Sequence, residues 1–289
     1  MWHIYTTARA GMKPMRMHYS YACCLLLLSV YAATGTASEM FIKPESFEQL
    51  PNSAQTAYLF NGTIDRSSYS TDFERVADLS IVTSTGRVSP LQEQWQVQDR
   101  LSAFDYEATK PGTYVIGLST HPRTIEMSSE EFAAYLAHEG LDDDLADFKA
   151  NWQDSSVRER YAKHSKAIMQ VGESFSSEYQ SRLQHKLEIV PEQNPYQLRF
   201  GNEMTVQVLI DGRPAANRVA RAGAEDFHGH DVSGGHLKYY TLHTDEDGRA
   251  TFLISQKGTW YVSAIHLEPS TDSDVDYESN WATLTFAVD

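Results

Sequence analysis

The stretch DFHGHDVSGGH, residues 226–236, contains the densest group of possible metal ligands in the chain. His228 and His230 are two positions apart, so an extended backbone places both imidazoles on the same side. The glycine between them lets the backbone bend and bring the rings inward. The SGG turn that follows can fold His236 back as a third ligand, and Asp231 can ligate or orient a ring. The spacing therefore predicts a metal site, with a solvated polar loop as the alternative.

His266 is the fourth candidate ligand. It follows the strand-like run GTWYVSAI and precedes an acidic turn that contains Asp272, Asp274 and Asp276. These residues can approach the same site. The alternative is a histidine at a strand end that bonds a neighbouring aspartate. Imidazole ligands completed by water suit nickel, cobalt, copper or zinc, and intrinsic affinity favours copper.

Sequence motifs of the common enzyme classes are missing. The chain has no G-x-S-x-G, no phosphate-binding loop, no H-E-x-x-H and no glycine-rich dinucleotide turn. Paired carboxylates are abundant in any chain with 39 acidic side chains, so they do not mark an active site. We therefore expect a protein that is not an enzyme.

The first 37 residues have the pattern of a secretory signal peptide. Lys13 and Arg16 form a positive region, Tyr21 to Ala33 form an apolar region, and small residues follow up to Ala37. The apolar run is shorter than the roughly 18–20 residues that a membrane-spanning helix needs. We expect a periplasmic protein without stable membrane insertion after cleavage.

Cleavage would also remove both cysteines, Cys23 and Cys24, so the exported chain would have no disulfide and no thiolate ligand. Residues 1–37 contain three basic and no acidic side chains, so their loss changes the net charge from −15 to −18. A surface this acidic repels nucleic acid and anionic lipid and attracts cations.

Two blocks of strand-like sequence flank a helical one. Runs such as TAYLFNG and GTYVIGLST predict an amino-terminal antiparallel β-sandwich over residues 38–122. From residue 184 to 289, strand-like runs alternate with the turn signatures DGRP and DEDG, which predicts a second sandwich. The order of strands and turns resembles that of transthyretin-like and immunoglobulin-like modules. The expected fold is mainly β, with two domains.

Residues 123–183 predict a helical insertion between the sandwiches. Ser128 and Glu131 form a capping box, and an apolar face at i, i+3 and i+4 follows up to Gly140. A second short helix follows, and residues 155–172 have spacing that fits a third. His164 lies on that third element and is expected to pack or to form hydrogen bonds. His185 is expected at the surface.

Stretches along the mature chain resemble one bacterial family. They include FIKPESF, PGTYVIGLSTHPRTIEMSSEEFAAYL, RERYAKHSKAIMQVG, HGHDVSGGH, GTWYVSAIH and DVDYESNWATLTF. Together they are similar to an exported domain-of-unknown-function family often labelled the periplasmic component of cobalt/nickel (ABC-type or ECF) uptake. Many members begin the mature chain with histidine, whereas Ser38 and Glu39 stand in those places here.

The resemblance implies a protein that binds nickel or cobalt and delivers it to a membrane metal-uptake transporter. His228, His230, His236 and His266 are then the expected ligands. The alternative is an interaction module of the cell envelope that binds no metal.

Overall fold

Strands make up most of the computed structural model, which describes residues 39–231 and 233–289. The prediction of a mainly β fold is confirmed. The predicted signal peptide lies outside the described residues. The described residues all belong to one compact unit.

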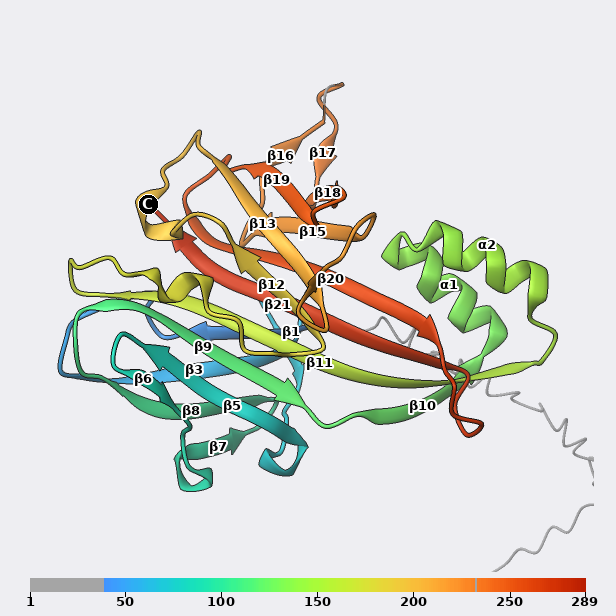
Figure 1. Cartoon of the computed structure of the whole chain (residues 1–289), viewed down its shortest axis with the longest axis horizontal. Coiled ribbons are helices and arrows are strands. Elements are labelled where there is room, and N and C mark those ends of the chain that lie inside the picture. The colour runs from blue at the N-terminus through green and yellow to red at the C-terminus, as the bar shows by residue number, and fades with distance from the viewer. Residues whose placement is uncertain (1–38, 232) are drawn as a thin grey trace, which may run out of the picture. The chain divides into compact units, whose positions relative to one another are not determined.

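Two large sheets contain most of the strands (Figure 1). The five-stranded sheet consists of β1 (Glu39–Pro44), β3 (Ser53–Gly62), β4 (Ser67–Tyr69), β7 (Trp95–Gln98) and β8 (Leu101–Ala108). The ten-stranded sheet consists of β2 (Glu48–Gln49), β5 (Val76–Thr83), β6 (Gly86–Val88), β9 (Gly112–Thr120), β10 (Arg123–Ser128), β11 (Ser156–Val171), β15 (Val219–Ala224), β18 (Tyr240–His243), β20 (Gly258–Pro269) and β21 (Tyr277–Val288).

Smaller elements complete the structure. A four-stranded sheet consists of β12 (Leu187–Pro191), β13 (Glu203–Ile210), β14 (Arg213–Pro214) and β19 (Arg249–Leu253), and a hairpin consists of β16 (Gly229–His230) and β17 (His236–Leu237). The α-helices are α1 (Ser129–Glu139) and α2 (Asp142–Asn151), and the 3-10 turns are η1 (Phe73–Arg75), η2 (Gln92–Gln94), η3 (Ser177–Gln180) and η4 (Pro195–Gln197).

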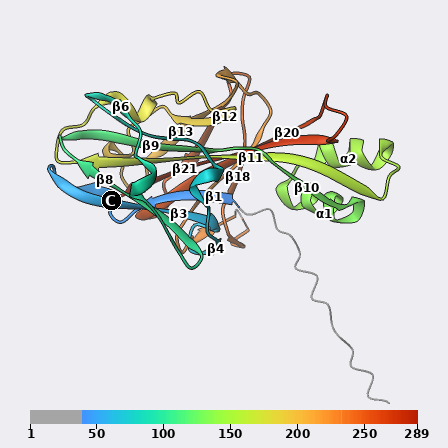
Figure 2. The same cartoon turned by 90° about the horizontal axis from the view of Figure 1, so that it is seen from below.

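The central strands of the ten-stranded sheet are buried on both faces. On β11, the Ser165 hydroxyl donates to the Met40 carbonyl of β1, whereas the next side chain, Lys166, donates to the Ile189 carbonyl of β12. Successive side chains of a strand point to opposite faces. The five-stranded and four-stranded sheets therefore cover opposite faces of the ten-stranded sheet, as Figures 1 and 2 show.

The prediction of a third helix over residues 155–172 was wrong. This stretch forms β11, which pairs with β21 in parallel and with β9 and β10 in antiparallel register. Its polar side chains Lys163, His164 and Lys166 are buried. A strand buried on both faces does not alternate between apolar and polar residues, so the sequence lacked the period of two that identifies strands.

The two predicted α-helices are present and pack on one end of the ten-stranded sheet. The capping box of Ser128 and Glu131 is formed, and Gly140 ends α1 at φ 72°. Phe132, fully buried, packs against Phe148 of α2 and Tyr277 of β21, with ring centroids 4.9 and 4.8 Å away. The helices thus extend the core beyond the area that the smaller sheets cover.

The ten-stranded sheet contains strands from all three predicted segments, since β9 precedes residue 122, β11 lies between the boundaries, and β20 follows residue 184. The boundaries at 122 and 184 therefore do not separate independent sheets. The division into two domains, and the likeness of each to an immunoglobulin module, stay predictions. No helix in the described part of the chain has both the length and the apolarity needed to cross a membrane.

Candidate functional site

Three of the four predicted ligands lie together on the β16–β17 hairpin. His230 of β16 is directly opposite His236 of β17, and their ring centroids are 5.4 Å apart. The His228 ring lies 6.4 Å from the His236 ring. All three side chains are exposed. We call this group the histidine hairpin. The predicted return of His236 toward the other two histidines is therefore present in the structure.

Phe227 holds the hairpin against the ten-stranded sheet. Its ring makes edge contacts with Tyr240 and Trp260, at centroid distances of 5.0 and 5.7 Å. A Cβ atom on Gly229 would lie 2.3 Å from the Phe227 ring. Only glycine fits that close approach, which explains the glycine between the first two histidines.

Hydrogen bonds determine which polar atoms of the hairpin are free. Nδ1 of His236 lies 3.1 Å from the Gly229 carbonyl, which can only accept, so Nδ1 is the donor, and Nε2 has no hydrogen-bond partner among the described residues. Oδ1 of Asp231 accepts hydrogen bonds from Ser233 and Gly235. The Ser233 side chain first, and then these backbone groups, lower the pKa of Asp231. Asp231 therefore acts in the turn that joins the two strands.

The rings of the histidine hairpin do not yet form a metal site. Those of His230 and His236 are nearly parallel, at 14°, so their nitrogen edges do not converge. Within residues 39–231 and 233–289, no group of three or more histidine, cysteine, aspartate or glutamate side chains has an arrangement that could hold a metal ion. Coordination would require rotation of the imidazoles.

His266 lies apart from the histidine hairpin. It is on β20, six residues beyond Trp260, which is about 20 Å along an extended strand. The side chain is buried, Nε2 lies 3.4 Å from Glu268, and Nδ1 has no partner. Burial, and then the nearby charge of Arg218, lower its pKa. The nearby acidic turn is also engaged elsewhere, since Asp272 pairs with Arg160 and Asp276 with Arg158.

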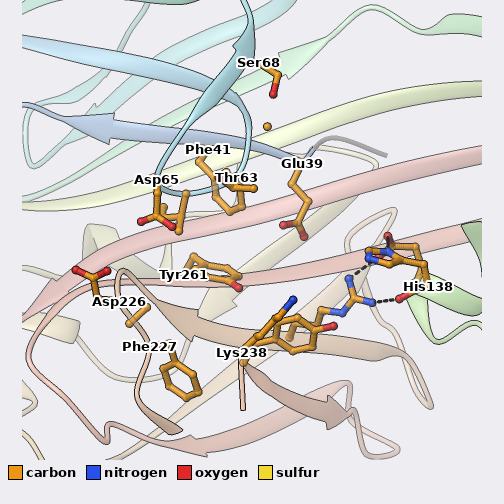
Figure 3. Close-up of a pocket in the computed structure, with 16 residues that line it drawn as sticks. Glu39, Phe41, Thr63, Asp65, Ser68, His138, Asp226, Phe227, Lys238 and Tyr261 are labelled. Atoms are coloured by element: carbon orange, nitrogen blue, oxygen red, sulfur yellow. Dashed lines mark hydrogen bonds and ion pairs between the residues drawn. The ribbon is translucent and has the colours of Figure 1, made fainter. Parts of the chain in front are cut away.

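A cavity of about 520 Å³ adjoins the base of the hairpin (Figure 3). Six separate parts of the chain line it: β1, residues 62–68, the end of α1, β15 with the residues that follow it, residues 238–239, and β20. Phe41 and Tyr261, in edge contact at 5.3 Å, form an aromatic wall. Asp226 and Lys238, which flank the histidine hairpin in sequence, also line the cavity.

Carboxylates outnumber free cations in this cavity. Arg221 is occupied, because it pairs with Glu139 at 2.6 Å and donates to the His138 carbonyl. Glu39 and Asp65 have no such partner among the described ion pairs. Burial raises the pKa of both, and the charges of Glu139 and Glu225 respectively add to the effect. The cavity therefore favours positively charged ligands.

Sequence reasoning missed this cavity because its lining comes from segments up to 222 positions apart, from Glu39 to Tyr261. Each segment reads as ordinary strand or turn. Glu39, which with Ser38 stands in the places where many members of the resembled family are expected to begin with histidine, is part of that lining.

A second histidine pair lies in the core. His164 and His185 are buried, and their ring centroids are 5.4 Å apart. His164 donates from Nε2 to Asn280 and accepts at Nδ1 from Ser119, which confirms that it forms hydrogen bonds. The expectation that His185 lies at the surface was wrong, because its ring packs beneath the ten-stranded sheet and bonds Asp78.

The family profile of the domain of unknown function DUF4198 matches residues 36–268. The chain belongs to this family. This confirms the resemblance at the level of an uncharacterised domain family, and the nickel/cobalt label stays a prediction. No curated protein matches the sequence.

Solved structures are only distantly similar to this DUF4198 member. A variant of Salmonella α2-macroglobulin is 12% identical over 86% of this chain, with a TM-score of 0.25, and this chain covers 15% of its length. The Yersinia pseudotuberculosis adhesin InvE is 12% identical over 87% of this chain and 59% of its own, with a TM-score of 0.21. At such TM-scores these likenesses assign neither a fold family nor a function.

Proposed function

We propose that this protein is an exported, non-enzymatic metal-binding protein of the periplasm. In this proposal His228, His230 and His236 bind a divalent transition metal, nickel or cobalt, and the protein passes the ion to a membrane uptake transporter. The observation that supports it most is the cross-strand pairing of His230 and His236 on one short hairpin.

The ring spacing suits a shared ion. An imidazole nitrogen that binds zinc lies about 2.0–2.1 Å from the ion, and the distance is similar for nickel, cobalt and copper. Two rings that bind one ion therefore have centroids roughly 5–6 Å apart. The observed separations of 5.4 and 6.4 Å are close to this range. The hairpin brings the rings of His228 and His230 near that of His236, and side-chain rotation would have to turn their nitrogen atoms toward one ion.

Two further features support the choice of a cation. The Gly229 carbonyl holds the proton of His236 on Nδ1, and this kind of outer contact orients a ligating imidazole. The adjoining cavity adds the carboxylates of Glu39 and Asp65, neither of which takes part in a described ion pair. His266 has no part in this proposal, since it lies far along β20.

Isothermal titration of the purified protein with Ni²⁺, Co²⁺, Zn²⁺ and Cu²⁺ tests the proposal. We expect saturable binding of one ion at micromolar or lower concentration, with copper tightest in vitro. Replacing His236, the central ring, should weaken binding at least tenfold in His236→Gln. The matched controls are His243→Gln, an exposed histidine of β18, and His266→Gln, which should both bind like the wild type.

Flat titrations for all four ions would refute the metal proposal, as would equal affinity in His236→Gln. An envelope interaction module without metal is the second candidate. It is favoured by the lack, within the described residues, of a group already arranged to hold an ion. It predicts the flat result, and the aromatic and acidic cavity would then be the surface to probe with candidate partners.

A further inference from the structure

A second, smaller cavity lies between the five-stranded and ten-stranded sheets. It has a volume of about 60 Å³ and is separate from the cavity beside the histidine hairpin. Three cations from distant parts of the chain line it: Arg75 of η1, Arg123 of β10 and Lys163 of β11. Such a cluster is unexpected in a chain whose net charge is −15.

These cations lack acidic partners. Among the described residues, no carboxylate lies within ion-pair distance of any of the three. The Arg75 side chain is only 8% exposed, and its Nη1 is buried without a hydrogen-bond partner. Asp72 is the one carboxylate in the lining, and it is exposed. The lining of the cavity therefore includes a buried guanidinium whose Nη1 has no hydrogen-bond partner.

Neighbouring groups only partly compensate the buried charges. Lys163 is also 8% exposed, and Nζ donates to Asn61 Oδ1 at 2.8 Å, which leaves donor capacity unused. The Tyr161 ring lies 5.3 Å from the Arg75 guanidinium and 5.8 Å from Lys163 Nζ. Burial, and then the charge of Arg75, lower the pKa of Lys163 to about 8, against the opposing effect of the more distant Glu39 carboxylate. A bound anion would relieve this repulsion.

We propose that this cavity binds a small oxyanion group between Arg75, Arg123 and Lys163. By the usual requirement of about 10–15 Å³ per ordered water, the cavity has room for about four to six water-sized atoms, which is the size of phosphate or sulfate. Guanidinium groups suit planar carboxylates and tetrahedral oxyanions because they donate two parallel hydrogen bonds. The site does not depend on metal binding at the histidine hairpin.

Isothermal titration with sodium phosphate, sodium sulfate and sodium acetate, at constant ionic strength, tests this site and separates tetrahedral from planar ligands. We expect one of them to bind at a single site in the wild type. Arg75→Gln removes the buried donor, and Arg123→Gln changes an exposed side chain of the lining. Each should weaken binding at least tenfold. Lys257→Gln, an exposed lysine elsewhere, should leave binding unchanged.

A thermal-unfolding comparison keeps the proposal testable if Arg75→Gln folds poorly. In chloride buffer, Lys163→Met should unfold at or above the wild-type temperature, because it removes an uncompensated buried charge. In a buffer that contains the anion found to bind, the unfolding temperature of the wild type should rise, and that of Lys163→Met should rise little. Equal gains in both would indicate general salt stabilisation and overturn the proposal. So would flat titrations with all three anions, or affinity that survives both arginine substitutions.

Discussion

Hydrogen-bond partners decide which side chains of the histidine hairpin remain available to a ligand. Asp231 and His236 are both potential ligands by residue type. The Asp231 carboxylate is occupied by Ser233 and Gly235, whereas His236 uses only Nδ1 and keeps Nε2 free. The sequence predicted which residues gather here, because spacing and turn residues are local. It could not assign these partners, since they depend on how the turn closes.

His164 gives a prediction about acid sensitivity. Burial first, and then nearby His185, lower its pKa from 6.5 to about 4, against the opposing hydrogen bond to Asn280. The unfolded chain therefore takes up this proton between about pH 6.5 and 4 while the folded chain does not. The contribution of His164 to the free energy of unfolding is about 3 kcal/mol. It is fully present above pH 6.5 and is lost as the pH falls toward 4.

Urea unfolding at pH 7.5 and pH 4.5 measures this effect in the wild type and in His164→Gln. The free energy of unfolding should fall less with acid in the variant, whatever its stability at pH 7.5. If the free energy of unfolding fell by the same amount between pH 7.5 and pH 4.5 in both proteins, His164 would have the same pKa in the folded and the unfolded chain.

At the scale of secondary-structure elements, the α1–α2 pair depends on one aromatic side chain. Phe132 is fully buried and contacts Tyr135, Phe148 and Tyr277. Phe132→Ala should lower the free energy of unfolding by about 3–5 kcal/mol, because it leaves a cavity where both helices meet the sheet.

Chemical denaturation of Phe132→Ala and Phe175→Ala checks that estimate. Phe175 is 48% exposed, so its removal should change stability by no more than about 0.5 kcal/mol. A loss of similar size in both variants would mean that the helices do not depend on the Phe132 contacts.

Local signals predicted α1 correctly and β11 incorrectly. Ser128, Glu131 and Gly140 specify helix ends through contacts within a few residues, so sequence alone was sufficient. For β11, Lys166 is buried because Glu188 of another sheet lies 2.6 Å away. No periodicity can report such a distant partner, and the same stretch also fits helical spacing. The two cavities were missed for the same reason.

At the scale of the whole molecule, the Lys166–Glu188 pair joins the ten-stranded sheet to the four-stranded sheet. Both side chains are buried, and Glu188 also accepts hydrogen bonds from the backbone at Leu183 and Gln184. Glu188→Gln should cost about 3–5 kcal/mol, because it leaves the Lys166 charge without its partner.

A double-mutant cycle with Lys166→Met and Glu188→Leu measures the coupling by urea unfolding. Each single variant leaves one buried charge, so the double variant should be more stable than the sum of the two losses predicts. Additive losses would show that the two charges do not compensate one another.

The first and last described strands, β1 and β21, pack against each other across the core. Thr283 and Thr285 of β21 donate to the Met40 and Ile42 carbonyls of β1, across 243 positions of sequence. β21 also lies inside the ten-stranded sheet, between β20 and β11. A growing polypeptide therefore lacks a central strand of this sheet until residues 277–288 are made, and pairings of such long range form slowly. A chain shortened before residue 277 should therefore leave β20 and β11 without the strand that joins them, and both would lose their backbone hydrogen-bond partner along that edge.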